Sequence, residues 1–250
     1  MRDWPCETWT RDLSLALPGI QVQVLPEVDS SNSELMRRAR AGDLRPQLLV
    51  ALTQTAGRGR MGRSWLSSPG DALTFSLGLP LHLNDWSGLS LAVGVSVTQS
   101  LHPEIQLKWP NDLWWQQRKL AGILVETANV GPQRYAVIGI GINLKARDAR
   151  HLSTSPAWLQ EALPGIEGPQ TLGRVLLPLV QTLLQFEREG FAAFREGFNA
   201  RDGLRERAVT LSDGTHGTAR GVNECGALLV HTAAGVQAIT SSEVSVRPLP

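Results

Sequence analysis

Cysteine and lysine are both scarce in this chain of 250 residues, and long apolar runs are missing. The two cysteines, Cys6 and Cys225, lie near opposite ends, so no disulfide framework and no cysteine metal site is implied. No apolar run reaches membrane-spanning length, and residues 1–7 contain no apolar core of signal-peptide length. We therefore expect a cytoplasmic protein in a reducing compartment, with no membrane partner.

An excess of either charge is also missing. Lys and Arg number 24 and Asp and Glu number 23, which leaves a net charge of +1. This balance argues against a chain whose main partner is nucleic acid or an anionic membrane, because such chains need a broad basic surface. Any cationic function must therefore be local. The apolar fraction of 42% and the charged fraction of 19% are typical of a folded globular protein.

Arginine supplies nearly all of the positive charge. Of the 24 basic residues, only Lys108, Lys119 and Lys145 are lysines. A lysine kept in such a chain can mark a place where a compact ammonium group is needed, although chance would explain it equally well. Two of the three lie in one short segment, and the motifs there decide between these interpretations.

Hydrophobic periodicity predicts the secondary structure. Strands are expected at 20–25, 48–52, 72–79, 105–109, 113–115, 119–127 and 134–143, and helices at 31–42, 86–101, 171–190 and 191–201, with Pro178 near the first turns of its helix. Residues 54–70 and 145–170 are expected to be loops, the second long enough for a functional lid, and 116–118 a hairpin turn. Four consecutive strands without intervening helices favour antiparallel pairing.

The composition changes near residue 205. From 207 to 250, short β-rich runs are broken by turn sequences such as Asp213-Gly214 and Ala234-Gly235, a rhythm typical of a small barrel. The sequence therefore predicts an α+β fold in two parts. Residues 1–204 would form a mixed, largely antiparallel sheet with flanking helices, and residues 205–250 a small β-barrel.

A loop rich in glycine and arginine is the most informative segment. It reads Gln54-Thr55-Ala56-Gly57-Arg58-Gly59-Arg60-Met61-Gly62-Arg63, and no acidic residue occurs between Asp43 and Asp71. Glycines let backbone N–H groups approach a ligand closely, and guanidinium groups grip phosphate or carboxylate in bidentate fashion. The loop is therefore suited to an anion. A mobile solvated loop or an RGG-like nucleic-acid contact is the alternative.

Three later segments carry further candidates, which are Lys108-Trp109-Pro110-Asn111-Asp112-Leu113, Lys119-Leu120-Ala121-Gly122-Ile123-Leu124-Val125-Glu126 and Ile138-Gly139-Ile140-Gly141-Ile142-Asn143. Asp112 could hold a metal ion or orient a lysine, or belong to an Asx-turn. Lys119 shares an apolar strand face, which is costly unless it meets an anion or reaches water. Alternating glycines leave room for a flat ligand or for tight sheet packing.

Taken together, the four segments resemble, in order and approximate spacing, the motifs of the biotin–protein ligases. The resemblance covers roughly residues 20–145 and continues more weakly through the C-terminal barrel. It implies a catalytic fold related to class II aminoacyl-tRNA synthetases, followed by an SH3-like barrel. Some bacterial members add an N-terminal winged helix that binds DNA. Only about 20 residues precede the first expected strand here, so we expect no such domain and no DNA partner.

The resemblance also implies a reaction and its partners. ATP and biotin would form biotinyl-5′-AMP, with Mg²⁺ as activator and no tightly bound metal, and a lysine of a biotin carboxyl carrier protein domain would then accept the biotin. Exposed strand edges permit a homodimer without requiring one. A lipoate or octanoate ligase on the same fold and a non-enzymatic biotin or nucleotide sensor are the alternatives. A nucleic-acid-binding module is a third, disfavoured by the near-neutral charge.

Site residues follow from the resemblance. The expected catalytic residues are Lys119, Arg58, Arg60 and Asp112, the last also as a Mg²⁺ ligand. Biotin would contact Ser30, Ser31, Asn32, Gln54, Gly57, Arg58, Gly59, Arg60, Trp65, Lys119, Gly122, Leu124 and Gly139, and ATP would contact Arg60, Arg63, Lys108, Asn111 and Asn143. Ser31 departs from the threonine common in the family, but it keeps the hydroxyl group, so we expect the polar role to survive.

Overall fold

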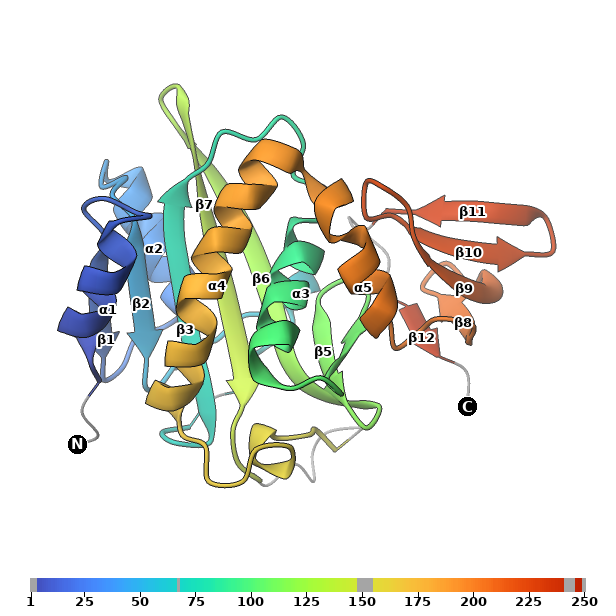
Figure 1. Cartoon of the computed structure of the whole chain (residues 1–250), viewed down its shortest axis with the longest axis horizontal. Coiled ribbons are helices and arrows are strands. Elements are labelled where there is room, and N and C mark those ends of the chain that lie inside the picture. Colours follow the sequence, from blue (N-terminus) through green and yellow to red (C-terminus); the bar gives the residue numbers. More distant parts are fainter. Residues whose placement is uncertain (1–3, 67, 148–154, 241–245, 249–250) are drawn as a thin grey trace.

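The structure is a computed structural model that describes residues 4–66, 68–147, 155–240 and 246–248. Its larger part is built on a seven-stranded sheet (Figure 1) with the spatial order β1-β2-β3-β7-β6-β5-β4. The strands are β1 (Gln21–Leu25), β2 (Gln47–Ala51), β3 (Ala72–Pro80), β4 (Gln106–Lys108), β5 (Asp112–Trp115), β6 (Arg118–Val130) and β7 (Gln133–Asn143). Only β1 and β2 pair in parallel, because α2 crosses between them; every other neighbouring pair is antiparallel.

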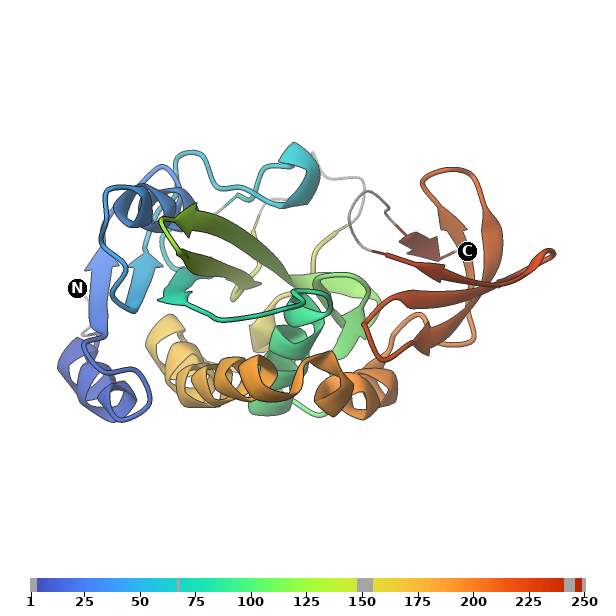
Figure 2. The ribbon, with the colours of Figure 1, turned by 90° about the horizontal axis from the view of Figure 1, so that it is seen from above.

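Helices cover one face of the sheet almost completely. On that face lie α1 (Cys6–Ser14), α3 (Leu89–Leu101), α4 (Gly168–Glu189) and α5 (Arg195–Arg201), whereas α2 (Ser31–Arg40) lies on the opposite face (Figure 2). Helix α3 contains no charged residue and is buried along most of its length between the sheet and α4. Gly94 lets it approach the sheet closely, since a Cβ there would stand 2.8 Å from Leu107. One face is therefore filled by the core, and the other is left for a site.

The C-terminal part forms a separate antiparallel sheet. It consists of β8 (Ala208–Leu211), β9 (His216–Val222), β10 (Leu228–Thr232), β11 (Gly235–Ile239) and β12 (Val246–Pro248), in the order β11-β10-β9-β8-β12. It contacts the larger part through the turn before β10, where the buried Trp109 indole donates a hydrogen bond of 3.0 Å to the Gly226 carbonyl. This contact stands one residue before Pro110, in the segment that carries Asn111 and Asp112.

The predicted α+β fold with a small C-terminal β module is confirmed, while several boundaries differ. Helix α1 was not expected, because nine residues with Trp9 and Leu13 as the buried pair give a weak periodic signal. Helix α3 begins at Leu89 instead of Trp86, because Gly88 adopts a positive φ of 79°. Helix α4 begins at Gly168, inside the loop expected at 145–170, so Pro178 lies in its middle and not near its first turns.

In the described part of the chain, the remaining short elements are three 3₁₀ turns, namely η1 (Arg60–Gly62), η2 (Leu159–Glu161) and η3 (Phe191–Phe194). The last was expected to be part of an α-helix from 191 to 201. Turn η1 lies within the arginine–glycine loop, and η2 lies within the expected loop at 145–170, whose residues 148–154 are outside the described part. Among the described residues, no helix is long and apolar enough to cross a membrane.

Candidate active site

The sheet face that carries α2 contains a cavity of about 140 Å³. Its lining comes from segments far apart in sequence: the start of α2, the arginine–glycine loop, the turn between β4 and β5, and the central strands β3, β6 and β7. Figure 2 shows the loop after β2 crossing above this face of the sheet, on the side opposite α4. The four sequence motifs therefore meet around one space.

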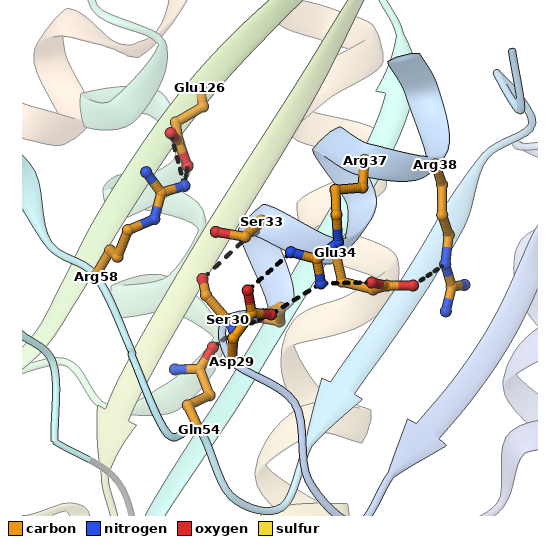
Figure 3. Close-up of polar contacts among 10 residues, drawn as sticks. Asp29, Ser30, Ser33, Glu34, Arg37, Arg38, Gln54, Arg58 and Glu126 are labelled. Atoms are coloured by element: carbon orange, nitrogen blue, oxygen red, sulfur yellow. Dashed lines mark hydrogen bonds and ion pairs between the residues drawn. The ribbon is translucent and has the colours of Figure 1, made fainter. Parts of the chain in front are cut away.

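The start of α2 forms the polar end of the cavity. Ser30 caps the helix, its side chain accepting the Ser33 N–H at 3.4 Å. The Gln54 side-chain oxygen accepts the Ser31 N–H at 2.7 Å and its hydroxyl at 3.0 Å (Figure 3 labels Ser30, Ser33 and Gln54). Because a helix N-terminus presents N–H donors, and these side chains add hydroxyl and amide groups, this end can match a ligand that both donates and accepts hydrogen bonds.

The arginine–glycine loop folds back on itself. The Gly59 N–H donates to the Arg63 carbonyl at 2.7 Å, and the Trp65 N–H donates to the Gly57 carbonyl at 2.8 Å. At its tip Met61 adopts a positive φ of 55°. Gly57 itself does not line the cavity: a Cβ there would stand 2.3 Å from the Trp65 carbonyl oxygen, so its glycine serves the close approach of the two loop limbs.

Glycines on β6 and β7 make a flat floor. Gly122 and Gly141 are paired in register, and Gly139 is paired with Leu124 two residues along. A Cβ at Gly141 would stand 2.4 Å from the Trp65 ring, and one at Gly139 would stand 2.2 Å from the Asn32 amide oxygen. The missing side chains therefore let Trp65 and Asn32 lie directly against the sheet, as the alternation of glycines suggests.

Charged groups gather at the other end. Lys119 Nζ lies 2.7 Å from Asp112 Oδ1 and 5.8 Å from the centre of the Trp65 ring. Arg60 donates to the Asn111 side-chain oxygen at 3.3 Å, and burial lowers the pKa of its guanidinium group. The register between β4 and β5 pairs Lys108 with Asp112. This turn therefore brings an ammonium, an amide and a carboxylate to one edge of the cavity.

The balance of charge in the cavity differs sharply from that of the whole chain. Five of the described lining residues are cationic and one, Asp112, is acidic, whereas the chain as a whole carries +1. The cations are Arg58, Arg60, Arg63, Lys108 and Lys119. A cavity with this excess, closed in part by low-dielectric protein, attracts and stabilises anions.

Most of the residues expected from the sequence line this cavity. Those that do are Ser30, Ser31, Asn32, Gln54, Arg58, Gly59, Arg60, Arg63, Trp65, Lys108, Asn111, Asp112, Lys119, Gly122, Leu124 and Gly139. Asn143 is not among them, and its expected approach to the nucleotide stays a prediction. Asn143 is buried, and its amide nitrogen donates to the carbonyls of Lys119 and Ala157, so it ties segment 157 to β6.

Sequence reasoning missed other lining residues, which are Met61, Ser64, Thr74, Phe75, Pro110, Ile123, Ile140 and Gly141. Gly141 could have been found, because it lies on the same strand face as Gly139. The expected metal site rests on Asp112 alone: within the described ranges, no group of three or more His, Cys, Asp or Glu side chains is placed to hold a metal ion.

Known proteins share these features. Residues 27–143 match the biotin/lipoate A/B protein ligase family, and residues 206–247 match the biotin protein ligase C terminal domain. The bifunctional ligase/repressor BirA of Escherichia coli is 36% identical over 245 residues, which cover 92% of this chain and 75% of that protein. The chain belongs to the biotin/lipoate A/B protein ligase family. The resemblance inferred from the motifs is thereby confirmed.

Other members of the family match along nearly their whole length. A biotin–[acetyl-CoA-carboxylase] ligase of Paracoccus denitrificans is 31% identical over 247 residues, 88% of this chain and 98% of that protein. Among solved structures, the biotin protein ligase of Aquifex aeolicus in complex with biotin and ATP superposes with a TM-score of 0.77 at 30% identity, covering 91% of this chain and 99% of that one. This family member is therefore an enzyme of the ligase class.

Proposed function

We propose that this chain activates biotin with ATP to biotinyl-5′-AMP and transfers the biotinyl group to a lysine of a biotin carboxyl carrier protein domain. The single observation that carries the proposal is the cavity in which five cations and one acid surround a floor of paired glycines. An acyl adenylate needs both features, since it combines a phosphate with a compact, largely apolar acyl group. The relatives named as biotin ligases support biotin as that group.

Adenylation brings two anions together. A carboxylate oxygen of biotin attacks the α-phosphorus of ATP, a new P–O bond forms, and the bond to the pyrophosphate leaving group breaks. The protein must offset the repulsion and stabilise charge on the α-phosphate. We assign this role to Lys119, Arg58 and Arg60. Asp112, 2.7 Å from Lys119, orients the ammonium group.

The two substrates occupy opposite ends of the cavity in this proposal. Ser30, Ser31, Asn32 and Gln54 supply donors and acceptors for the ureido ring, and Trp65, Gly122, Leu124 and Gly139 form walls for the apolar body of biotin. We assign Arg63, Lys108 and Asn111, which also line the cavity, to the nucleotide. Asn143 stays a candidate for the nucleotide, and its amide nitrogen donates to the Lys119 carbonyl.

Transfer uses the mixed anhydride. The neutral amine of the acceptor lysine attacks the acyl carbon, an amide bond forms, and AMP leaves with the electrons of the C–O bond. The attacking amine loses one proton. Asp112 is the acidic group among the described lining residues, so it is our candidate to receive that proton. No covalent enzyme intermediate is required.

Magnesium belongs with ATP in this proposal. Asp112 is the one carboxylate that the described lining offers, which fits an ion held mainly by phosphates and water, as Mg²⁺ commonly is, and does not fit a dedicated protein cage. When bound, the ion would neutralise phosphate charge. The protein residues discussed above bind and orient the substrates with or without it.

The decisive experiment is transfer of biotin to a purified carrier domain in the presence of ATP and Mg²⁺, followed by mass spectrometry of the carrier. We expect modification at one lysine that depends on ATP. Biotin-dependent exchange of pyrophosphate into ATP, run in parallel with lipoate, separates the two substrate classes. Exchange with lipoate but not biotin would replace the proposal with lipoate ligation, and exchange with neither would overturn the enzyme assignment of the cavity.

A further inference from the structure

Glu126 on β6 is an acidic residue at the edge of the site that the mechanism above does not use. Both of its carboxylate oxygens accept from Arg58 Nη2, at 2.9 Å and 2.8 Å, and one of them also accepts the Asn32 side-chain amide at 2.9 Å (Figure 3 shows the pair of Glu126 and Arg58). One carboxylate therefore joins the arginine–glycine loop to the first turn of α2.

These contacts close a circuit around the polar end of the cavity. The circuit is a series of side-chain hydrogen bonds that begins and ends on the arginine–glycine loop. Its members, in order, are Gln54, Ser31, Ser76, Asn32, Glu126 and Arg58. The Ser76 hydroxyl lies 2.7 Å from the Ser31 hydroxyl and 2.6 Å from the Asn32 amide oxygen. Each side chain in the circuit is thus fixed by its neighbours, and Glu126 is the member that returns it to the loop.

Glu126 also decides which way the Asn32 amide faces. Asn32 is 3% exposed, its nitrogen meets the Glu126 carboxylate and the Leu124 carbonyl, and its oxygen meets Ser76. A flipped amide would place its oxygen against two acceptors, which is unfavourable in a buried setting. A neutral acceptor at position 126 would remove the charge that enforces this choice.

Among the loop arginines, Arg58 has its side chain turned to the wall of the site, whereas Arg60 reaches the Asn111 turn on the other side. In this ion pair, the Arg58 side chain is 45% exposed and the Glu126 side chain is 24% exposed. Such a pair contributes little to overall stability. Its position is suited to hold the loop in one register over the cavity.

We propose that Glu126 is a positioning residue. It orients the Asn32 amide toward the biotin end and latches Arg58, so that the loop lies over the cavity before substrate arrives. That biotin is the substrate at this end rests on the proposed function. The latch itself rests only on the contacts of Glu126 with Arg58 and Asn32. The same carboxylate holds both partners, so ordering of the loop and shape of the biotin end are coupled through one side chain.

Glu126→Gln tests this role, with Glu34→Gln as the matched control. Glu34 also bridges two groups, Arg37 and Arg38, at 2.7 Å and 2.8 Å, and is 23% exposed, but neither arginine lines the cavity. Two readouts are compared: the KM for biotin against kcat in pyrophosphate exchange, and the rate of tryptic cleavage after residues 58, 60 and 63 without ligands. Neither substitution removes a trypsin site.

We expect Glu126→Gln to raise the KM for biotin about tenfold, with a smaller change in kcat, and to speed loop cleavage, because a charge-assisted bond is lost. Glu34→Gln should change neither quantity. In the double variant with Arg58→Gln, the increase in the KM for biotin should fall well short of the product of the two single increases, because the contact between Arg58 and Glu126 can be lost only once. The kcat loss from Arg58→Gln belongs to its role at the phosphate and is compared separately. Independent, multiplicative losses with unchanged cleavage would overturn the latch.

Two further arms keep the outcomes separate. If the Glu126→Gln variant melts well below the wild type, Glu126→Asp replaces it. The shorter aspartate side chain should also raise the KM for biotin and speed loop cleavage, with a melting temperature within about 2 °C of the wild type. If the wild type shows no biotin-dependent exchange, the proposed function fails, while the cleavage rates of the Glu126 and Glu34 variants still decide whether the loop is latched.

Discussion

At the scale of single residues, Lys119 and Asp202 carry charge in contrasting settings. The Lys119 side chain is 43% exposed and meets Asp112 at the edge of the cavity, where its cost to the fold is small. Asp202 is 9% exposed at the end of α5; one carboxylate oxygen accepts the Leu204 N–H at 2.9 Å, and the other has no hydrogen-bond partner in the described structure. The first charge serves chemistry, and the second costs stability.

Lys119→Ala is expected to lower biotin-dependent pyrophosphate exchange by about a thousandfold, because removal of a preorganised charge at the reacting phosphate loses several kcal/mol of transition-state stabilisation. The melting temperature should stay near that of the wild type. Lys145→Ala is the matched control, since Lys145 also forms one ion pair, 3.1 Å from Glu167, but lies outside the cavity. Near-normal exchange in the Lys119 variant would refute the assignment.

Asp202→Asn is expected to stabilise the protein above neutral pH. Burial raises the pKa of Asp202 from its ordinary 3.8 to about 6. The folded state favours the protonated carboxyl group. The stability that protonated Asp202 gives the folded protein is therefore fully present below about pH 4 and is lost as the pH rises through about 6. The gain from the neutral amide, which keeps a carbonyl acceptor for Leu204, should be about 1–3 kcal/mol at pH 8 and smaller at pH 5. Urea unfolding at the two pH values measures it, and an equal difference at both would contradict the account.

At the scale of elements, the pairing of β6 with β7 determines the floor of the site. The register places Gly122 opposite Gly141 and Leu124 opposite Gly139, so side chains are missing from one face over two adjacent strands. Because side chains on strands alternate between faces, the neighbouring residues Ile138 and Ile142 contribute to the core on the other face. One pair of strands can therefore support both the core and the cavity.

Gly139→Ala is expected to raise the KM for biotin by about tenfold or more, because the new methyl group would stand 2.2 Å from the Asn32 amide oxygen and displace it from the circuit at the polar end. The control is Gly173→Ala on the exposed side of α4, where the nearest heavy atom would be 3.7 Å away. It should leave kinetics unchanged and stabilise the helix by up to about 1 kcal/mol. Equal biotin KM values for both variants and the wild type would rule out the tight floor.

At the scale of the whole molecule, the C-terminal sheet contacts the catalytic part at several points. The Trp109 indole donates to the Gly226 carbonyl at 3.0 Å, and the Asn199 side chain accepts the Val222 N–H at 3.0 Å. The first of these contacts adjoins the turn that presents Asn111 and Asp112. The C-terminal sheet thus supports the charged end of the cavity from outside.

Trp109→Phe is expected to destabilise the protein by about 2–4 kcal/mol, since it leaves the Gly226 carbonyl without its buried donor and opens space around a side chain that is 1% exposed. Unfolding in urea, followed by fluorescence and by circular dichroism, should remain one transition that shifts as a whole. Trp86→Phe is the control, because the Trp86 indole nitrogen has no hydrogen-bond partner among the described residues. Two separated transitions in the Trp109 variant would show that the parts merely loosen from each other.

The sequence by itself determined the family, the α+β fold and most of the cavity lining, because these depend on local signals. Glycine and arginine alternate within one loop, and apolar residues alternate along β6 and β7. Short elements and element ends gave weaker signals: α1 was missed, and the start of α4 was placed inside a loop. A short helix and the first turn of a longer one are held mainly by tertiary packing, which local periodicity does not record.

Only the tertiary structure decided how distant polar groups share partners. Glu126 and Asn32 are 94 positions apart, and Arg58 and Glu126 are 68 apart, so no spacing rule predicts their contacts. Asn143 stood in a recognisable motif, yet only the structure shows that its amide nitrogen donates to the Ala157 carbonyl, 14 positions away. A motif shows which residue is present. What that residue contacts depends on how α2, the arginine–glycine loop and β6 come together in space, because hydrogen bonds and ion pairs act only over a few ångströms.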